Sequence, residues 1–318
     1  MSPTEPSLGG LRILAPLRGV TIRAFRETFA DVIAESGFTE AVTPFISAMP
    51  GLDPLKDREL AASSIGQSER SANRTILPVT PQFIGKDPNA LRACLLKVRE
   101  AGYDTADLNA GCPFPMVRNK GRGSGLMRTP DVLRCLLEVG CETMGEGKFS
   151  LKIRLGVDRP DELIGLMPLI NAFPLRYLTV HARTARQMYE GRCDVERLRE
   201  VERAAQVPVV ENGDIPFPPV PDSGAIDQSE QSTNPNNAPP VMIGRGFVRY
   251  LGTREDADAL VRRYVAASQR ELSGDRPVLG RMKELLAYWK DLPAWRRRWN
   301  VLKICRSVDE LLSILSDS

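Results

Sequence analysis

A (β/α)8 barrel followed by a small basic helical domain is the fold class that this sequence predicts. Eight short apolar runs, separated mainly by helical patterns, occupy about 240 residues, as a TIM barrel requires. Polar residues follow the carboxyl ends of most of these runs. After the eighth run, the rest of the chain shows only helical patterns. A doubly wound open sheet is the alternative. It would need a glycine fingerprint after its first strand, whereas Gly121-x-Gly123-x-Gly125 follows the fourth and has another spacing. We therefore expect a barrel over residues 1–250 and a helical domain over 251–318.

The expected strands are apolar runs of three to seven residues that end at a turn or a polar tip, a length typical of strands. They cover 12–16, 41–45, 79–84, 105–108, 149–155, 177–181, 207–210 and 241–243. The helices between them show apolar residues at a spacing of three and four, as Ile22, Phe25 and Phe29 do. They cover 22–33, 91–99, 132–139, 162–170 and 195–205.

Two segments interrupt this alternation. Residues 53–73 are polar, and we expect a helix or a loop there. Residues 216–240 begin Pro-Phe-Pro-Pro and continue as a mixture of Ser, Asn, Gln, Asp and Pro without apolar periodicity. A helix that covers a sheet needs an apolar face, so we expect a long loop in place of the seventh helix.

The end of the chain is helical and basic. Apolar periodicity predicts helices over 257–272, 279–289 and 308–315, with Trp295-Arg-Arg-Arg-Trp299 between the last two. Residues 249–306 contain 14 Lys and Arg against 7 Asp and Glu, whereas the net charge of the whole chain is only +3. Such a concentration of cations favours a polyanionic partner, with RNA as the first candidate. The alternative is that exposed helix faces carry Arg for solubility.

Composition excludes several classes of protein. The chain of 318 residues is 42% hydrophobic and 26% charged, which is ordinary for a soluble globular protein. It has no apolar run of 18 residues and no secretory signal, so we expect no membrane association. Six cysteines form no Cys-x-x-Cys pair and are accompanied by a single histidine. We therefore expect no metal site, reduced thiols and a cytoplasmic location.

Seven polar residues lie at or just beyond strand ends, and in a barrel these positions converge on the active face. They are Gln82, Asn109, Cys112, Lys152, His181, Asn212 and Arg245. An isolated Asn or Gln more often stabilises a loop, but seven such residues over six strands favour a site. Cys112 stands between an apolar strand and a glycine-rich cationic loop, a suitable place for chemistry on an anionic substrate. The alternative for Cys112 is a small buried residue at a turn.

Seven motifs occur in an order and spacing that resemble the tRNA-dihydrouridine synthase family. They are Leu14-Ala-Pro-Leu-Arg-Gly-Val-Thr21, Pro81-Gln-Phe-Ile-Gly85, Asp107-Leu-Asn-Ala-Gly-Cys-Pro113, Lys152-Ile-Arg-Leu-Gly156, Val180-His-Ala-Arg-Thr184, Asn212-Gly-Asp-Ile215 and Met242-Ile-Gly-Arg-Gly246. The resemblance covers the barrel from Leu11 to Phe247, and the basic tail resembles that family's tRNA-recruiting helical domain in pattern.

The resemblance implies an FMN-dependent enzyme that reduces the C5–C6 double bond of D-loop uridines in tRNA, with NADPH as electron donor. It implies that Cys112 donates the proton and that Asn109 helps to seat the uracil. The residues that it implies for FMN are Pro16, Leu17, Gln82, Lys152, His181, Asn212, Gly213, Asp214, Gly244 and Arg245. We expect a monomer with tRNA as its partner.

The chemistry of these residue types agrees with such roles. A thiol of ordinary pKa is mostly protonated at pH 7 and can donate to a carbanion-like C5. Lys152 can favour the anionic reduced flavin, while Arg245 and the glycines beside it suit a phosphate. Candidates for tRNA phosphates are Arg118, Lys120, Arg122, Arg183, Arg296, Arg297 and Arg298, each also explicable as an ordinary solvated cation.

The chain departs from the family pattern at several positions. Leu17 and Arg18 replace a usual Met and an acidic or small residue, and Gly123-Ser-Gly125 replaces a usual Gly-Ala. The missing helix after Ile215 lies beside the expected phosphate site and affects the expected FMN affinity. Two alternatives therefore stay open: a flavin oxidoreductase acting on a free pyrimidine or an enone, and a tRNA-binding homologue impaired in catalysis.

Overall fold

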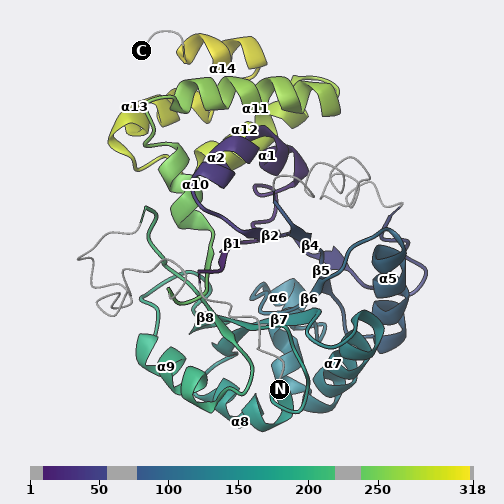
Figure 1. The fold of residues 1–318 in the computed structure, drawn as a ribbon. Helices are drawn as coiled ribbons and strands as arrows, with labels where there is room; N and C mark the ends of the chain where they lie inside the picture. Colours follow the sequence, from purple (N-terminus) through teal and green to yellow (C-terminus); the bar gives the residue numbers. More distant parts are fainter. Residues whose placement is uncertain (1–9, 56–76, 219–237, 316–318) are drawn as a thin grey trace.

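The computed structural model describes residues 10–55, 77–218 and 238–315, and in them parallel strands alternate with helices around a barrel (Figure 1). All strand pairs are parallel. The strands are β1 (Arg12–Leu14), β2 (Glu40–Val42), β3 (Ile46–Ser47), β4 (Val79–Thr80), β5 (Gln82–Ile84), β6 (Ala106–Ala110), β7 (Phe149–Gly156), β8 (Leu178–Thr184), β9 (Val209–Asn212) and β10 (Val241–Ile243). The barrel that the sequence predicts is confirmed.

Ten strand segments form the eight strand positions of the barrel (here called staves), because two of these positions are each divided into two segments. The order is β3-β5-β6-β7-β8-β9-β10-β1-β2-β4, and β2 runs on into β3 as β4 runs on into β5. The sheet therefore closes through these two staves. Pro81 separates β4 from β5, since proline has no N–H for the ladder. The side chain of Thr43 accepts instead from the Gln82 N–H at 3.0 Å, so the two staves stay joined across the break.

Helices cover the outside of the barrel. They are α1 (Arg23–Thr28), α2 (Ala30–Glu35), α5 (Pro88–Glu100), α6 (Pro115–Arg118), α7 (Pro130–Met144), α8 (Glu162–Ile170), α9 (Val195–Ala204) and α10 (Arg245–Leu251), with a 3₁₀ helix η1 (Gly123–Arg128). The starts of α5 and α7 follow from sequence, because Pro88 and Pro130 occupy first-turn positions, where a missing N–H costs nothing. Asp87 caps α5 by accepting from the N–H groups of Asn89 and Ala90.

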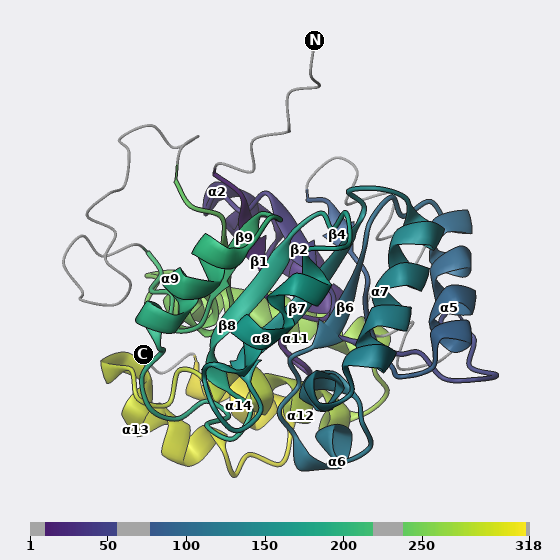
Figure 2. The same cartoon turned by 90° about the horizontal axis from the view of Figure 1, so that it is seen from below.

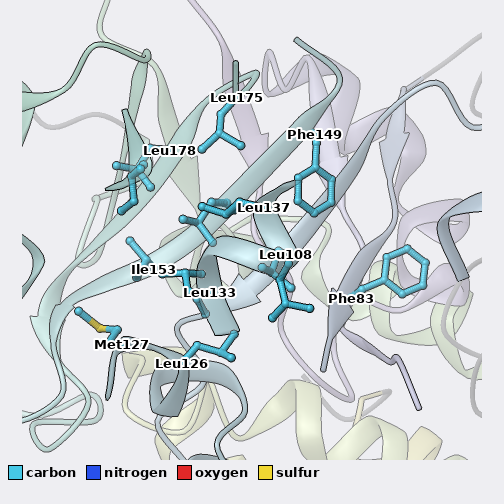
Figure 3. Close-up of a cluster of buried hydrophobic side chains, with 14 of the residues drawn as sticks. Phe83, Leu108, Leu126, Met127, Leu133, Leu137, Phe149, Ile153, Leu175 and Leu178 are labelled. Carbon is cyan, nitrogen blue, oxygen red and sulfur yellow. The ribbon is translucent and has the colours of Figure 1, made fainter. Parts of the chain in front are cut away.

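One large hydrophobic cluster joins the strands to their helices (Figure 3). Leu108 on β6 and Phe149 and Ile153 on β7 face Leu133 and Leu137 of α7, and all five are buried. Figure 3 also shows Leu126 and Met127 of η1 closing the cluster at one end. The loop that follows β6 is therefore fixed to the core, which holds the residues just before it in place.

The last four helices form a layer over one side of the barrel (Figure 1). They are α11 (Ala257–Glu271), α12 (Asp275–Leu286), α13 (Pro293–Leu302) and α14 (Val308–Ile314). Figure 2 shows α12, α13 and α14 at the same end of the molecule as α6, which follows the carboxyl end of β6. A second hydrophobic cluster continues from α1 and α2 into α11–α14. The core thus runs across residue 250, and a domain boundary there stays a prediction.

Two tryptophans attach this layer to the barrel. The indole N–H of Trp289 donates to the carbonyl of Val248 at 2.6 Å, and that of Trp295 to the carbonyl of Gly252 at 2.8 Å. Both indoles are buried and pack edge to face at 4.6 Å between ring centroids. The Trp-rich basic segment between the expected helices is therefore itself a helix, α13, with Trp295 facing inward.

Several expectations are corrected in detail. The helix expected over 22–33 is divided into α1 and α2 at Phe29, and α10 follows β10 directly. The polar segment 53–73 falls largely on residues 56–76, outside the described part of the chain. The long loop expected over 216–240 likewise falls mainly on 219–237; its described ends, 216–218 and 238–240, lie in neither helix nor strand. Within the described residues, no helix is long and apolar enough to span a membrane.

Candidate active site

A cavity of about 1060 Å³ opens where the strands end, between the barrel and the loop that follows α12. Seven cationic side chains line it, but only two acidic ones, Asp214 and Asp291. Such an excess of positive charge in a partly buried site favours an anionic ligand. Of the residues predicted from sequence, those that line it are Pro16, Leu17, Asn109, Cys112, Lys152, His181, Arg183, Asn212, Gly213, Asp214, Gly244 and Arg245.

Lys152 reaches into the cavity from the middle of β7. Its Nζ donates to Oδ1 of Asn212 at 2.8 Å, and the Asn212 amide in turn donates to the Met242 carbonyl at 2.7 Å. Burial lowers the pKa of Lys152 to about 7, with the charge of Arg154 adding to the effect and Asp107 opposing it. A bound anion would reverse this shift by stabilising the ammonium form.

Asp214 bridges two arginines at the opposite wall. It accepts from Arg183 Nη2 and, at 2.8 Å, from Arg245 Nη2, and its own φ is +49°. Arg183 is buried and also donates to the carbonyls of Glu190 at 3.1 Å and Gly191 at 2.6 Å. The alternative of an ordinary solvated cation therefore does not hold at Arg183, because its guanidinium is part of the cavity wall, whereas a contact with tRNA stays a prediction; Arg245 is about one-third exposed.

The only histidine of the sequence, His181, lies between these two groups of cations. Burial lowers its pKa well below the usual 6.5, and the charges of Arg154, Lys152 and Arg183 lower it further. The imidazole is therefore neutral at pH 7. Its neighbour Gly213 adopts a φ of +113°, and a Cβ there would lie 2.5 Å from the His181 ring. Only glycine fits this position against the ring.

Cys112 lies at the cavity floor with its backbone held on both sides. Its N–H donates to Asn109 Oδ1 at 2.9 Å, and its carbonyl accepts from the N–H of Ser124 at 3.1 Å and the hydroxyl of Ser124 at 2.9 Å. Burial raises the pKa of the thiol, although the Phe114 N–H and the charge of Arg154 act in the other direction. The thiol is therefore protonated at neutral pH and lines the cavity, so it is more than a packed turn residue.

Gln82 lies behind Asn109, outside the cavity lining. It is fully buried; its amide nitrogen donates to Asp107 Oδ2 at 2.8 Å, and its amide oxygen accepts from Asn109 at 2.7 Å. Burial raises the pKa of Asp107 to about 7, against the hydrogen bonds from Ser150 and Gln82. Gln82 thus supports the cavity from below, which differs from its expected place beside a cofactor.

Two residues of the cavity wall, Arg154 and Tyr189, were not predicted from sequence. The buried guanidinium of Arg154 donates to three carbonyls, those of Gly111 at 2.9 Å, Thr184 at 3.0 Å and Met188 at 2.7 Å. It follows Lys152 by two residues on β7, so strand alternation could have placed it on the same face. The Tyr189 ring lies between the guanidinium groups of Arg154 and Arg245, at 5.3 and 5.1 Å from its centroid.

Helix α10 and the helical layer also contribute to the cavity, which no local sequence pattern indicated. Arg249 comes from α10, and Tyr288, Lys290 and Asp291 come from the loop after α12. Arg18, the residue that departs from the family pattern, lines the mouth with its guanidinium 5.8 Å from the centroid of the Phe45 ring.

The glycine-rich loop after Cys112 is less exposed than expected. Residues 123–127 are buried in η1, and Gly123 adopts a φ of +55° with its Cα against Cys112, where a Cβ would lie 2.7 Å from the Cys112 Cβ. Lys120 is exposed, whereas Arg118 and Arg122 are only half-exposed. Of this cationic loop, Lys120 is therefore the side chain most accessible to a partner.

The three consecutive arginines of α13 differ from one another. Arg296 and Arg297 are exposed. Arg298 forms a two-pronged ion pair with Asp258 at 2.7 and 2.8 Å and lies 5.0 Å from the Trp295 ring centroid. The alternative of an ordinary solvated cation does not hold at Arg298, because this side chain ties α13 to α11, whereas a contact with tRNA stays a prediction. Neither these arginines nor Arg118, Lys120 and Arg122 line the cavity.

Comparisons with known proteins agree with this geometry. The tRNA-dihydrouridine(16) synthase of Pseudomonas putida is 28% identical over 292 residues, covering 86% of this chain and 86% of its own. The tRNA-dihydrouridine synthase B of Vibrio vulnificus is 29% identical over 234 residues, covering 73% of this chain and 66% of its own. Among solved structures, morphinone reductase in complex with tetrahydroNAD has a TM-score of 0.50 at 12% identity, covering 77% of this chain and 86% of its own. This last likeness shows a shared barrel fold.

The family itself is established by a sequence model. The model of the dihydrouridine synthase (Dus) family matches residues 13–252, three quarters of the chain, and its range includes every strand but the first residue of β1. The match contains the cavity floor, the cationic wall and Cys112. This chain is a member of the dihydrouridine synthase family.

Proposed function

We propose that the protein reduces the C5–C6 double bond of a uridine in tRNA to give dihydrouridine, with FMN as its cofactor and NADPH as electron donor. The observation that carries the proposal is a protonated thiol, Cys112, at the floor of a cationic cavity that also holds Lys152. The two relatives described above carry names that specify dihydrouridine formation in tRNA. Such chemistry requires a hydride for C6 and a proton for C5.

The residues of the cavity suit FMN. A phosphate group carries about two negative charges at neutral pH, and a wall formed by Arg245, Arg183 and the neutral His181 can accept it. Gly244 lies close to Leu17 and Ala15, with 3.1 Å between Ala15 Cβ and the place of a Cβ at 244, so a side chain would press on the strand ends there. Pro16, Leu17, Asn212, Gly213 and Asp214 are the remaining lining residues that we propose for the cofactor.

Bound FMN, once reduced, supplies a hydride for C6 of the uracil. The Cys112 thiol then donates its proton at C5, and it is competent to do so because burial keeps it protonated. Lys152, fixed by Asn212 at 2.8 Å, holds a positive charge where the reduced cofactor is electron-rich. Asn109 keeps one amide N–H beyond the one that it gives to Gln82, and this N–H can seat the uracil.

The tRNA partner follows from the charge of the helical layer and of the cavity rim. Arg296 and Arg297 are exposed on α13, and Lys120 is exposed just after α6. We propose that these cations contact phosphates, and that Arg249 and Lys290 guide the strand into the cavity that they line. Recruitment of a polyanion such as tRNA requires cations outside the reaction centre, and these residues provide them.

A uridine at position 16 is the target that we propose. Two relatives named for position 16 match 86% and 87% of this chain, whereas two named synthase B match 73% and 65%. The longer matches extend beyond the barrel, into the part of the chain that we expect to orient the tRNA.

The proposal is tested with purified protein, NADPH and a transcript tRNA. Mass-spectrometric mapping should find dihydrouridine at position 16, and the bound flavin should be released as FMN on denaturation. Turnover of free uracil or of an enone at the rate found with tRNA would favour the small-molecule alternative. A colourless preparation that takes up no FMN, yet binds tRNA with a steep salt dependence, would favour a catalytically impaired homologue.

A further inference from the structure

We infer that Asp107 is a positioning residue for Cys112, acting through the side chains of Gln82 and Asn109. The inference rests on the proposed role of Cys112 as proton donor and adds residues that do not touch the reacting atoms. Asp107 and Gln82 are fully buried, and Asn109 and Cys112 are largely buried at the cavity lining. The arrangement of these groups therefore depends on the hydrogen bonds among them.

A continuous chain of hydrogen bonds leads from Asp107 to the backbone of Cys112. Asp107 Oδ2 accepts from Gln82 Nε2 at 2.8 Å, and Gln82 Oε1 accepts from Asn109 Nδ2 at 2.7 Å. Asn109 Oδ1 accepts from the N–H groups of Gly111 at 3.1 Å and Cys112 at 2.9 Å. Each link is within ordinary hydrogen-bond distance, so a change at one end is transmitted to the other.

The carboxylate fixes the direction of this chain. Above its pKa of about 7, Asp107 is mostly ionised and only accepts hydrogen bonds, and its Oδ1 already accepts from the Ser150 hydroxyl at 2.7 Å. Gln82 must therefore present its amide nitrogen to Asp107 and its oxygen to Asn109. Asn109 must then present nitrogen to Gln82 and oxygen to the Cys112 N–H. If the Gln82 amide reversed, Asn109 would have to reverse as well, and its nitrogen would face the backbone N–H groups of 111 and 112.

Two further hydrogen bonds explain why this chain determines the position of the Cys112 thiol. Arg154 Nε donates to the carbonyl of Gly111 at 2.9 Å, and Ser124 donates to the carbonyl of Cys112. These bonds hold the carbonyl groups of the turn, whereas its N–H groups at 111 and 112 both donate to Asn109. A reversed Asn109 amide would therefore leave two buried N–H donors unpaired directly beside the proton donor.

Strand alternation explains why these residues meet. Asp107 and Asn109 are two residues apart on β6 and so face the barrel interior together, while Leu108 between them faces α7. Gln82 is the registered neighbour of Asp107 on β5, and Ser150 is its registered neighbour on β7. Three adjacent strands thus build the support, and the loop after β6 carries its effect to Cys112.

The test compares Asp107→Leu with Asp107→Asn in the FMN-loaded enzyme. The leucine removes the acceptor, whereas the asparagine oxygen can still accept from Gln82 while its nitrogen faces the Ser150 hydroxyl. We expect Asp107→Leu to lower kcat for tRNA about tenfold, the effect of removing one buried hydrogen bond, with KM for tRNA unchanged. We expect Asp107→Asn to restore most of the rate. Iodoacetamide labelling of Cys112, followed by peptide mass spectrometry without tRNA, should become faster in the leucine variant and move its pH profile.

Glu40→Gln is the matched control for reduced stability. Glu40, at the start of β2, is a buried carboxylate outside this hydrogen-bond chain: it accepts from Thr80 at 3.0 Å and Tyr177 at 2.8 Å and pairs with Arg176, and it acts on Asp107 only through its charge, which raises the pKa of Asp107. This variant should lower the melting temperature without changing Cys112 labelling. Equal kcat and labelling rates in Asp107→Leu and Glu40→Gln would overturn the inference.

A second substitution keeps the inference testable if Asp107→Leu does not fold. Gln82→Met breaks the next link at similar volume and should reproduce faster Cys112 labelling. Because both residues act through one chain, Gln82→Met should also lower kcat for tRNA about tenfold; wild-type kcat and labelling rates in Gln82→Met would refute the chain. The labelling readout is independent of turnover. If Cys112→Ala stayed active, Cys112 would not be the proton donor. The labelling result would still decide whether Asp107 positions Cys112.

Discussion

Lys152 provides a direct prediction about how FMN binding depends on pH. Burial lowers its pKa from 10.5 to about 7 in the cavity without an anion. At about 1.36 kcal/mol per pH unit, this corresponds to a destabilisation of the ammonium form on the order of 5 kcal/mol. If Lys152 holds FMN as proposed, an electron-rich group of the cofactor would remove most of that cost, so the bound state should keep the lysine protonated well above pH 7. Binding should therefore take up a proton.

The sign and size of the effect follow from that pKa. At pH 8 the free enzyme holds Lys152 mostly neutral and the complex holds it charged, so nearly one proton should enter per FMN bound. Affinity should fall as the pH rises above 7, by up to about tenfold per pH unit, which is the limit for one linked proton. Asp107, with a pKa of about 7, is already mostly ionised at pH 8 and contributes little to the balance. The phosphate of free FMN is also ionised at that pH.

Isothermal titration calorimetry in buffers of different ionisation enthalpy measures this proton uptake. Lys152→Met is the matched variant, because methionine keeps the length of the side chain and removes the charge. It should bind FMN more weakly at pH 7, take up no proton at pH 8 and show a flat dependence between pH 7 and 9. The same proton uptake in wild type and Lys152→Met would refute the reasoning.

Three further outcomes are expected. Charge reversal at Arg296 and Arg297, which are exposed, should weaken tRNA binding and reduce the slope of log Kd against log salt by about one for each phosphate that the helix no longer binds, with flavin reduction by NADPH unchanged. Arg298→Ala should instead lower the free energy of unfolding by about 1–3 kcal/mol, because it breaks a two-pronged ion pair. A wild-type free energy of unfolding in a denaturant titration would contradict this. Gly123→Ala should cost about 1–3 kcal/mol of stability through its positive φ and should lower the rate of uridine reduction, because the added carbon meets Cys112; unchanged thermal unfolding and turnover would contradict this.

The fold was predictable because the barrel repeats one simple pattern. The strand expected over 241–243 and the helix over 162–170 have the observed bounds, since apolar runs and periodicity determine both. The interruption between β4 and β5 was not predicted, although Pro81 indicated it. Residues 79–84 are apolar enough for one strand, and only the hydrogen bonds of the closed barrel reveal that the proline divides it.

The candidate site was predictable where strand ends determine it and not where distant segments meet. Lys152, Asn212 and Cys112 line one cavity as expected, because they lie on or just after parallel strands of one barrel. Arg154 had a signal in its spacing of two from Lys152, which places both side chains on one face of β7. Lys290 comes from the helical layer, and no local pattern specifies where that layer packs on the barrel.

Exposure was the property that sequence predicted least well. Arg183, Arg298 and the loop at 123–127 all resemble solvated segments in composition, yet tertiary contacts bury Arg183 and the loop and cover much of Arg298. A guanidinium with five donors can be buried where several acceptors surround it, and Arg183 has such a set in Asp214 and two carbonyls. Sequence shows the donor, but the acceptors come from the fold.

The central claim is that Cys112 supplies the proton in an FMN-dependent reduction of uridine in tRNA. Its most direct test is a single turnover in which enzyme reduced by NADPH is mixed with transcript tRNA and dihydrouridine is quantified by mass spectrometry. Wild type should form dihydrouridine as its flavin reoxidises. Cys112→Ala should retain FMN and its reduction by NADPH, yet react with tRNA at least about 100-fold more slowly, as for removal of a general acid. Dihydrouridine formation at the wild-type rate by Cys112→Ala would contradict the claim.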